Sequence, residues 1–154
     1  MDCDGRSVPD RMAWDLISNH EVGHWVAAQT DGGYFEERSQ AIGLIKDGKL
    51  VAGVIYENWN GRSVVCHIAI VGQVNRRFLR MICGFAFEGL KADKVIGPIA
   101  SSNVKSIKVA KAIGFTEEAR ITNAAPSGDI ILFTLTAEQC RFLGDRHGKR
   151  QRSD

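Results

Sequence analysis

Two side chains near the middle of this 154-residue sequence have the chemistry of a general base. His67 lies in a segment rich in Val and Ile, and histidine exchanges a proton readily near neutral pH. Glu57 lies just before the turn Asn58–Gly61 that precedes this segment, and it would act through a water molecule. The alternative is a half-buried histidine with a structural hydrogen bond and a solvated carboxylate at a turn. Either side chain could therefore remove a proton from an attacking nucleophile.

A glycine turn and two arginines follow the same segment and suit phosphate. Gly72 permits a tight turn, and the helix expected to begin near Asn75 has free backbone amides at its first turn. Arg76 and Arg77 add cationic donors that match phosphate oxygens. The alternative is an ordinary loop with a solvated basic pair.

Pro98 interrupts the strand expected over residues 94–99. Proline has no backbone N–H, so a proline within a central strand argues against continuous pairing. If residues 94–99 run parallel to residues 63–71, the two strands separate near Pro98, and the edge of residues 68–71 needs other hydrogen-bond partners. A polar turn then ends at Asn103, ahead of an amphipathic helix. The sequence predicts a gap for a long, thin ligand with peptide-like amides and phosphates.

A competing motif lies nearer the N-terminus. His20-Glu21-Val22-Gly23-His24 matches the His-Glu-x-x-His signature of zinc hydrolases, in which two histidines share one helix face and the glutamate activates water. Gly23 weakens a helix there, and no third ligand follows at a familiar spacing. The preferred interpretation is therefore a chance match on an ordinary helix, and no metal is expected.

Hydrophobic periodicity supplies the scaffold for these residues. It predicts helices over residues 13–30, 75–90, 103–113 and 136–143, the last capped by Thr136, and strands over residues 41–45, 50–56, 63–71, 94–99, 116–121 and 130–135. Asp47-Gly48 predicts a hairpin turn. The strand–helix–strand unit over residues 63–99 should form a right-handed parallel crossover. The expected fold class is a mixed α/β sheet with helices on both faces.

A series of short motifs appears in a characteristic order along the chain: Phe85-Ala86-Phe87-Glu88-Gly89-Leu90, Lys94-Val95, Asn103, Ser106, Val109, Gly114-Phe115, Glu118 and Arg120. This order resembles the GNAT superfamily of acyl-CoA-dependent N-acetyltransferases, in its ribosomal-protein and N-terminal acetyltransferase branch. Four other segments resemble short acetyltransferase-like proteins of tailed phages: Trp25-Val26, Gly53–Tyr56, His67–Ala69 and Cys140–Leu143. The likeness spans residues 25–143.

The resemblance implies a mostly antiparallel sheet with a central splayed parallel pair, and acetyl-CoA as cosubstrate. An amine (a protein N-terminus, a lysine or a small amine) would attack the thioester directly, with His67 or Glu57 taking the proton and a backbone amide near Ile70 or Val71 facing the oxyanion. The resemblance also implies contacts with the cofactor. The pantetheine arm would pair with the backbone of Ile68, Ala69, Ile70 and Val71, and the pyrophosphate would bind the backbone amides of Gln73, Val74, Asn75, Arg76 and Arg77. Asn103 would lie near the thioester, and Ser106 and Lys108 would lie along the far side of the cofactor.

Two departures from the superfamily pattern support an alternative. The usual phosphate loop has a second glycine, which Gln73-Val74-Asn75-Arg76-Arg77 lacks. Many members carry a tyrosine four residues before the Gly-Phe pair, as an acid for the leaving thiolate, and Ala110 stands there. The alternative is a non-catalytic interaction module with the same fold.

Composition limits the remaining possibilities. Hydrophobic residues make up 44% and charged residues 25% of the chain, and the net charge of +2 gives no reason to expect a nucleic-acid partner. No segment predicts a membrane span or a secretory signal, so a cytoplasmic location is expected, where the four cysteines would stay reduced. We expect a flexible N-terminus over residues 1–12, one domain over residues 13–143, and a basic flexible tail over residues 144–154. Exposed sheet edges allow either a monomer or a homodimer.

Overall fold

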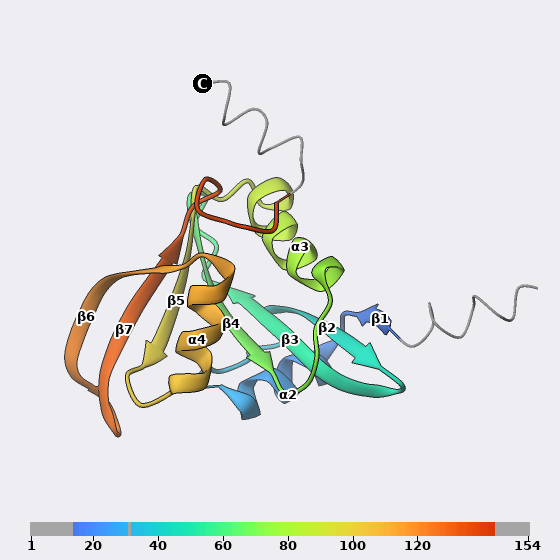
Figure 1. The fold of residues 1–154 in the computed structure, drawn as a ribbon, viewed down its shortest axis with the longest axis horizontal. Coiled ribbons are helices and arrows are strands. Elements are labelled where there is room, and N and C mark those ends of the chain that lie inside the picture. The colour runs from blue at the N-terminus through green and yellow to red at the C-terminus, as the bar shows by residue number, and fades with distance from the viewer. Residues whose placement is uncertain (1–13, 31, 144–154) are drawn as a thin grey trace, which may run out of the picture.

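A seven-stranded sheet in the order β1-β2-β3-β4-β5-β7-β6 carries the whole arrangement (Figure 1). The computed structural model describes residues 14–30 and 32–143, so the expectations for residues 1–12 and 144–154 lie outside the described residues. The elements are β1 (Trp14–Ile17), α2 (His20–Gln29), β2 (Gln40–Lys46), β3 (Lys49–Glu57), β4 (Ser63–Ile70), α3 (Arg76–Gly84), the π-helix η2 (Phe85–Gly89), β5 (Lys94–Ala100), α4 (Val104–Ile113), β6 (Thr116–Ala125) and β7 (Gly128–Leu135).

The strands predicted over residues 41–45, 50–56 and 63–71 are present and form an antiparallel meander. Strands β2, β3 and β4 pair antiparallel in sequence order. Asp47 and Gly48 join β2 to β3 with φ angles of 52° and 82°, which is the positive-φ geometry of a tight hairpin turn. Strand β3 is covered on both sides, and Val54 and Ile55 are fully buried. Buried side chains on both faces therefore hold β3 between its neighbours β2 and β4.

Helices cover both faces of the sheet, as expected. On one face α3, η2 and α4 pack over a large core that includes Phe78, Phe115 and Phe133. On the other face α2 packs over a smaller core around Val22, Val26 and Ile55 (Figure 1). The mixed, mostly antiparallel fold class predicted from the sequence is confirmed.

The helix predicted over residues 13–30 was wrong in its first part. Residues Trp14–Ile17 form an edge strand that pairs antiparallel with β2, and the helix begins only at His20. The side chain of Asn19 marks this start, because its Oδ1 accepts a hydrogen bond of 2.9 Å from the Val22 amide. A four-residue edge strand depends on its partner, so local periodicity did not reveal it.

The helix predicted over residues 136–143 was also wrong. Thr136 and Gln139 exchange the two hydrogen bonds of a capping box, at 2.9 and 3.3 Å, yet only turns follow. The backbone of this segment forms a hydrogen bond with the last turn of α4 instead, since the Arg141 amide donates to the Ile113 carbonyl at 3.2 Å. Gly114 ends α4 with a φ of 126°, and a β-carbon there would collide with the carbonyl oxygen of Gln139. Close packing on the end of α4 thus replaces the expected helix.

Candidate active site

The parallel pair β4–β5 separates halfway along its length. Only Ser63, Val64 and Val65 pair with β5, opposite Lys94, Val95 and Ile96. Beyond Ile96, strand β5 continues to pair with β7, and Pro98 lies opposite Leu132. The predicted gap beside Pro98 is therefore present, and β4 runs on from Cys66 to Ile70 without a β5 partner.

A narrow cavity of about 30 Å³ lies in this gap. Strand β4 contributes Cys66, His67 and Ile68, and strand β5 contributes Gly97, Pro98 and Ile99. Asn103, Ser106 and Ala110 close it from the side of α4, and Thr30 reaches it from the end of α2. Three polar groups predicted for the site, those of His67, Asn103 and Ser106, thus meet in one slot between the strands.

The structure joins the two candidate bases into one pair. His67 Nε2 and Glu57 Oε2 lie 2.9 Å apart, and the side chains are only 9% and 15% exposed. They share a sheet face because Glu57 lies opposite Val65, which is two residues from His67 on β4. A carboxylate that accepts the Nε2 proton fixes the ring and leaves Nδ1 as the proton acceptor.

A glycine that was not predicted as a site residue covers the ring of His67. A β-carbon built on Gly32 would lie 2.5 Å from His67 Cγ and 2.6 Å from Nδ1. Thr30 holds this glycine, because its Oγ1 accepts a hydrogen bond of 3.2 Å from the Gly32 amide and donates one of 3.1 Å to the Val26 carbonyl. Residue type did not indicate this role, because Gly32 acts here by leaving space for the ring.

The pairing of β4 shows which backbone amides face the gap and could donate a hydrogen bond to an oxyanion there. The Val71 amide donates to the Val51 carbonyl at 2.8 Å, so it points toward β3 and away from the gap. Successive amides in a strand point to opposite sides, so the amides of Ile68 and Ile70 point toward β5. Of the two backbone amides suggested as oxyanion donors, only that of Ile70 points toward the gap. The side chain of Ala69 is buried on the α2 face.

The predicted phosphate loop leads from β4 into α3. Asn75 caps the helix, with Oδ1 accepting a hydrogen bond of 2.8 Å from the Phe78 amide. Gln73 Oε1 accepts one of 3.0 Å from Lys46 Nζ, and Val74 is half-buried against the main core. Arg76 and Arg77 are exposed at the first turn, and the Arg76 guanidinium lies 5.6 Å from the centre of the Phe142 ring.

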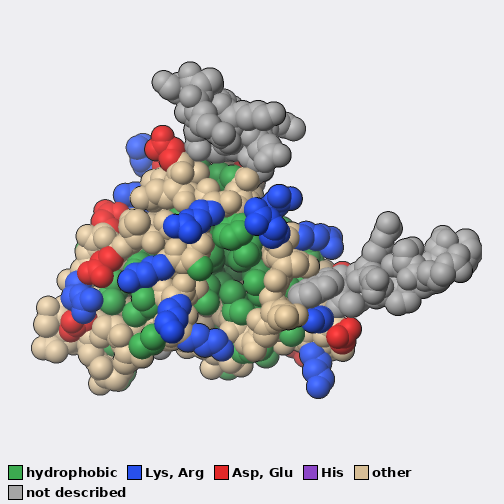
Figure 2. Space-filling view, viewed as in Figure 1, with side chains coloured by type: hydrophobic (Ala, Val, Ile, Leu, Met, Phe, Trp, Pro, Cys, Tyr) green, Lys and Arg blue, Asp and Glu red, His purple; other side chains and the backbone are tan. Residues whose placement is uncertain are grey.

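Hydrophobic side chains gather in a hollow between α3 and α4, and Lys and Arg side chains border it on both sides (Figure 2). Helix α3 carries Arg76, Arg77 and Arg80, and α4 carries Lys105, Lys108 and Lys111. An apolar floor with a cationic border suits a ligand that has a long neutral arm and several phosphates.

Asn103 and Ala110 have defined roles in α4. Asn103 is the N-cap, and its Oδ1 accepts a hydrogen bond of 3.2 Å from the Ser106 amide. Ala110 is buried and lines the cavity, so position 110 offers no hydroxyl to the gap. Ser106 is half-buried at the cavity, whereas Lys108 is exposed.

The His-Glu-x-x-His segment lies on α2, and its histidines contact two different partners. His20 Nδ1 lies 2.7 Å from the Tyr34 hydroxyl, and His24 Nε2 lies 2.9 Å from Glu36 Oε2. The hydrogen bond from His24 lowers the pKa of the Glu36 carboxyl. Within residues 14–30 and 32–143, no three His, Cys, Asp or Glu side chains gather as metal ligands.

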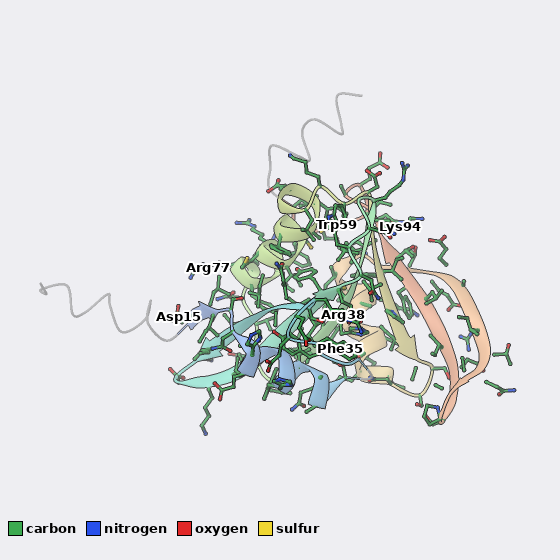
Figure 3. The ribbon with its side chains drawn as sticks, turned by 180° about the vertical axis from the view of Figure 1, so that it is seen from behind. Asp15, Phe35, Arg38, Trp59, Arg77 and Lys94 are labelled. Carbon is green, nitrogen blue, oxygen red and sulfur yellow. The ribbon has the colours of Figure 1, made fainter. Side chains whose placement is uncertain are left out.

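A second cavity, of about 340 Å³, is lined by Glu57 and shares no lining residue with the cavity in the gap. Trp59 and the segment from Glu36 to Gln40 also line it. Figure 3 shows Arg38 close to Phe35, and the Arg38 guanidinium lies 4.4 Å from the centre of the Phe35 ring. Tyr34, by contrast, lines a separate cavity with Met81 and Phe85. Among the described helices, none has the length and apolar character needed to cross a membrane.

Comparison with known proteins identifies structural neighbours and no family by sequence. No protein-family model and no curated protein matches the chain. A probable acetyltransferase is 24% identical, with a TM-score of 0.55 over 64% of this chain and 62% of its own. The spermidine/spermine N-acetyltransferase SpeG from Vibrio cholerae is 15% identical, with a TM-score of 0.64 over 93% of this chain and 98% of its own. The N-acetyltransferase PseH from Campylobacter jejuni, in complex with acetyl coenzyme A, is 18% identical, with a TM-score of 0.52 over 64% of this chain and 68% of its own. At these identities the likeness concerns the fold.

Proposed function

We propose that this chain, which has the fold of the GNAT N-acetyltransferases, transfers an acetyl group from acetyl-CoA to an amine. The observation that carries the proposal is the separation of β4 from β5 after Val65 and Ile96, with a cavity in the gap and the His67–Glu57 pair beside it. The bound acetyl coenzyme A of the structural neighbour PseH supports the choice of cosubstrate.

The pantetheine arm would lie in the gap and complete the ladder that β5 leaves open. Its amides would pair with the backbone of β4 from Ile68 to Ile70, because the N–H groups of Ile68 and Ile70 point toward the gap. Asn103 would bind the arm near the thioester, since its Oδ1 already caps α4 and its Nδ2 would be the donor. Ser106 would line the opposite side of the arm.

The pyrophosphate would lie at the start of α3. Backbone amides from Gln73 to Arg77 and the positive end of the helix would bind its oxygens, with Arg76 and Arg77 as charged donors. These two arginines would compensate for the second glycine of the usual loop. Lys108 on α4 would add positive charge on the other side of the hollow.

In the reaction, His67 would act as the base and Glu57 as the group that orients it. The neutral amine attacks the carbonyl carbon of the thioester, and His67 Nδ1 accepts the amine proton while Glu57 holds Nε2. The Ile70 amide would stabilise the oxyanion. The imidazolium then returns the proton to the departing thiolate, which supplies the acid that Ala110 cannot provide.

The acceptor would approach through the cavity that holds Glu57 and Trp59. His67 lines the cavity in the gap and Glu57 lines the cavity with Trp59, so the two substrates would approach the His67–Glu57 pair through different cavities. An amine carried by a protein N-terminus, a lysine or a small molecule fits this chemistry.

Binding is tested by calorimetric titration of the purified chain with acetyl-CoA. We expect one site with a dissociation constant in the micromolar range, about −7 to −8 kcal/mol. The absence of heat at millimolar acetyl-CoA would argue against the proposal.

Catalysis is tested with His67→Gln, Glu57→Gln and the double variant, by release of free CoA thiol with a panel of amines. Each single change should lower kcat by about 100-fold, and the double variant should lose little more, because the two side chains act as one unit. Acetyl-CoA affinity should stay within about threefold, since neither side chain is assigned to the arm. Additive losses would show that the residues act separately.

The alternative of a non-catalytic module has one observation in its favour, the buried Ala110 at the position where many members carry a tyrosine. It predicts that acetyl-CoA binds but that no amine in the panel releases CoA thiol. An Ala110→Tyr variant distinguishes the two, because a gain of turnover only in that variant would mean that the wild-type chain lacks the necessary acid.

A further inference from the structure

A cavity of about 770 Å³ lies where the edge strand β1 ends, apart from the proposed active site. Strand β1 stops at Ile17, opposite Gly43, and residues 40–42 of β2 have no partner on β1. The apolar side chains that line the cavity are Leu16, Ile17, Ile42, Met81 and Phe85. No residue lines both this cavity and the one in the gap, so the two are separate sites.

The backbone amide of Ala41 is an open hydrogen-bond donor at this cavity. Ser18 Oγ donates to the Ala41 carbonyl at 2.6 Å, so the backbone groups of Ala41 point toward the side where β1 has ended. No residue that the structure describes accepts a hydrogen bond from the Ala41 amide, although Ala41 is only 3% exposed. Buried amides nearly always have a partner, so this N–H favours an acceptor atom supplied by a ligand.

Polar side chains that line the same cavity offer donors too. Asn19 Oδ1 already accepts from the Val22 amide at 2.9 Å, which leaves the Nδ2 donors of Asn19. Ser39 is 6% exposed, and its Oγ accepts from the Phe35 amide at 3.2 Å, which leaves the hydroxyl proton. None of the residues that line the cavity is Asp, Glu, Lys or Arg. The cavity therefore presents neutral donors beside an apolar surface, with no carboxylate to repel an anion.

His20 and Tyr34 are held at the cavity by the helix that carries the His-Glu-x-x-His segment. His20 Nδ1 lies 2.7 Å from the Tyr34 hydroxyl, and a hydroxyl that donates to Nδ1 leaves the His20 proton on Nε2. The Tyr34 ring packs over Gly23, where a β-carbon would collide with it, and its centre lies 5.0 Å from that of the His24 ring. These contacts fix the imidazole of His20 beside the cavity before a ligand binds.

We propose that this cavity binds a small carboxylic acid with an apolar body, in its ionised form. One carboxylate oxygen would accept from the Ala41 amide and the other from Asn19 Nδ2 or His20 Nε2, and the apolar body would lie against Met81 and Phe85. An amine is disfavoured, since it needs acceptors, and a phosphate group would lack the Arg or Lys side chains that usually bind it. The proposal is independent of acetyl transfer, because no residue assigned to that reaction lines this cavity.

Titration of the full chain with sodium phenylacetate, followed by residue-resolved amide NMR, tests the site. We expect saturable shifts centred on the Ala41 amide, with a dissociation constant below about 1 mM. The neutral analogue phenylacetamide should bind at least about 10-fold more weakly, because it lacks the charge that strengthens hydrogen bonds to a carboxylate. The proposal would be overturned by an unchanged Ala41 amide at about 10 mM phenylacetate, by equal affinity for phenylacetamide, or by shifts confined to the gap between β4 and β5.

Asn19→Asp is the variant that tests the donors, because aspartate still caps α2 through the Val22 amide but replaces Nδ2 with a charged oxygen. We expect its affinity for phenylacetate to fall by about 10-fold or more. Asn60→Asp is the control, since it adds the same charge outside the cavity, at a turn where Asn60 Oδ1 accepts from the Ser63 amide at 2.8 Å. The control should change the affinity by less than about twofold. Equal affinities in the two variants, with amide spectra that show both to be folded, would contradict the assignment of this site.

Discussion

The imidazole of His67 occupies space that any residue other than glycine would need at position 32. This contact and the hydrogen bond to Glu57 hold the ring from two sides, which is what a precisely oriented base requires. Thr30 adds a third constraint, because it anchors the Gly32 amide.

Gly32→Ala tests this packing directly. The new methyl group would displace the His67 ring, so we expect turnover with the best amine to fall by about 10- to 100-fold while acetyl-CoA binding persists. Gly33→Ala is the matched control, because its β-carbon would lie 3.4 Å from Phe35, an ordinary contact. Equal turnover in the two variants would show that Gly32 does not position the base.

At the residue scale, the sequence predicted the types of side chain and missed how they are held. His67 was predicted from its side-chain chemistry, whereas Asn103 and Ser106 were implied by the family resemblance, and all three line the cavity. The pairing of His67 with Glu57 depends on the register of β3 and β4, which a single sequence does not reveal. Gly32 was missed because its role is the absence of a side chain.

At the scale of elements, the start of α3 decides how phosphate would bind. Arg76 and Arg77 lie in the first helical turn after the Asn75 cap, where the positive end of the helix also favours an anion. The long side chains are exposed, so their contribution should depend on salt.

Changing Arg76 and Arg77 together to Ala should weaken acetyl-CoA binding by about 10-fold or more, since charge-assisted hydrogen bonds to phosphate are lost. The salt dependence of the dissociation constant should flatten as well. Arg62→Ala is the control, because Arg62 is an exposed arginine that pairs with Asp93 at 3.4 Å beyond the other end of β4. Unchanged affinity in the double variant would remove the phosphate assignment.

Element boundaries followed from the sequence wherever local signals were strong. The Asp47-Gly48 turn and the helix over residues 103–113 appear where predicted, because the turn, the Asn103 cap and Gly114 each impose their own backbone geometry. Strand β1 and the segment after Thr136 differ from prediction, because both take their conformation from a neighbour, β2 in one case and the end of α4 in the other. The last part of the helix predicted over residues 75–90 is the π-helix η2, in which the Leu90 amide donates to the Phe85 carbonyl.

At the scale of the whole molecule, β7 sets the position of β5 once β4 has separated from it. Strands β5 and β7 pair along six residues from Val95 to Ala100, so β7 holds one wall of the gap. Phe133 on β7 lies opposite Gly97 and is 1% exposed in the main core. The wall of the gap formed by β5 and β7 therefore depends on the packing of the main core around Phe133.

Phe133→Ala should destabilise the fold by about 3–5 kcal/mol, because it removes a buried aromatic ring and leaves a cavity. Ile121→Ala, on the exposed strand β6, should change stability by less than about 0.5 kcal/mol. Urea unfolding followed by circular dichroism measures both. A small effect at Phe133 would mean that β7 does not anchor this wall.

The overall architecture was more predictable than the site, because a sheet topology follows from a few rules on strand order and crossover handedness. The gap itself was also foreseen, since a proline within a central strand cannot complete the ladder. The sequence did not show whether the amide of Ile70 or that of Val71 would face the oxyanion, because this depends on which neighbouring strand each amide faces.

Residue-resolved amide hydrogen exchange, with and without acetyl-CoA, measures most directly whether a ligand fills the gap. We predict that acetyl-CoA slows exchange at Ile68 and Ile70, whose amides face the gap, and leaves the Val71 amide, already bonded to Val51, nearly unchanged. Saturating acetyl-CoA that leaves the exchange of Ile68 and Ile70 unaltered would contradict the account.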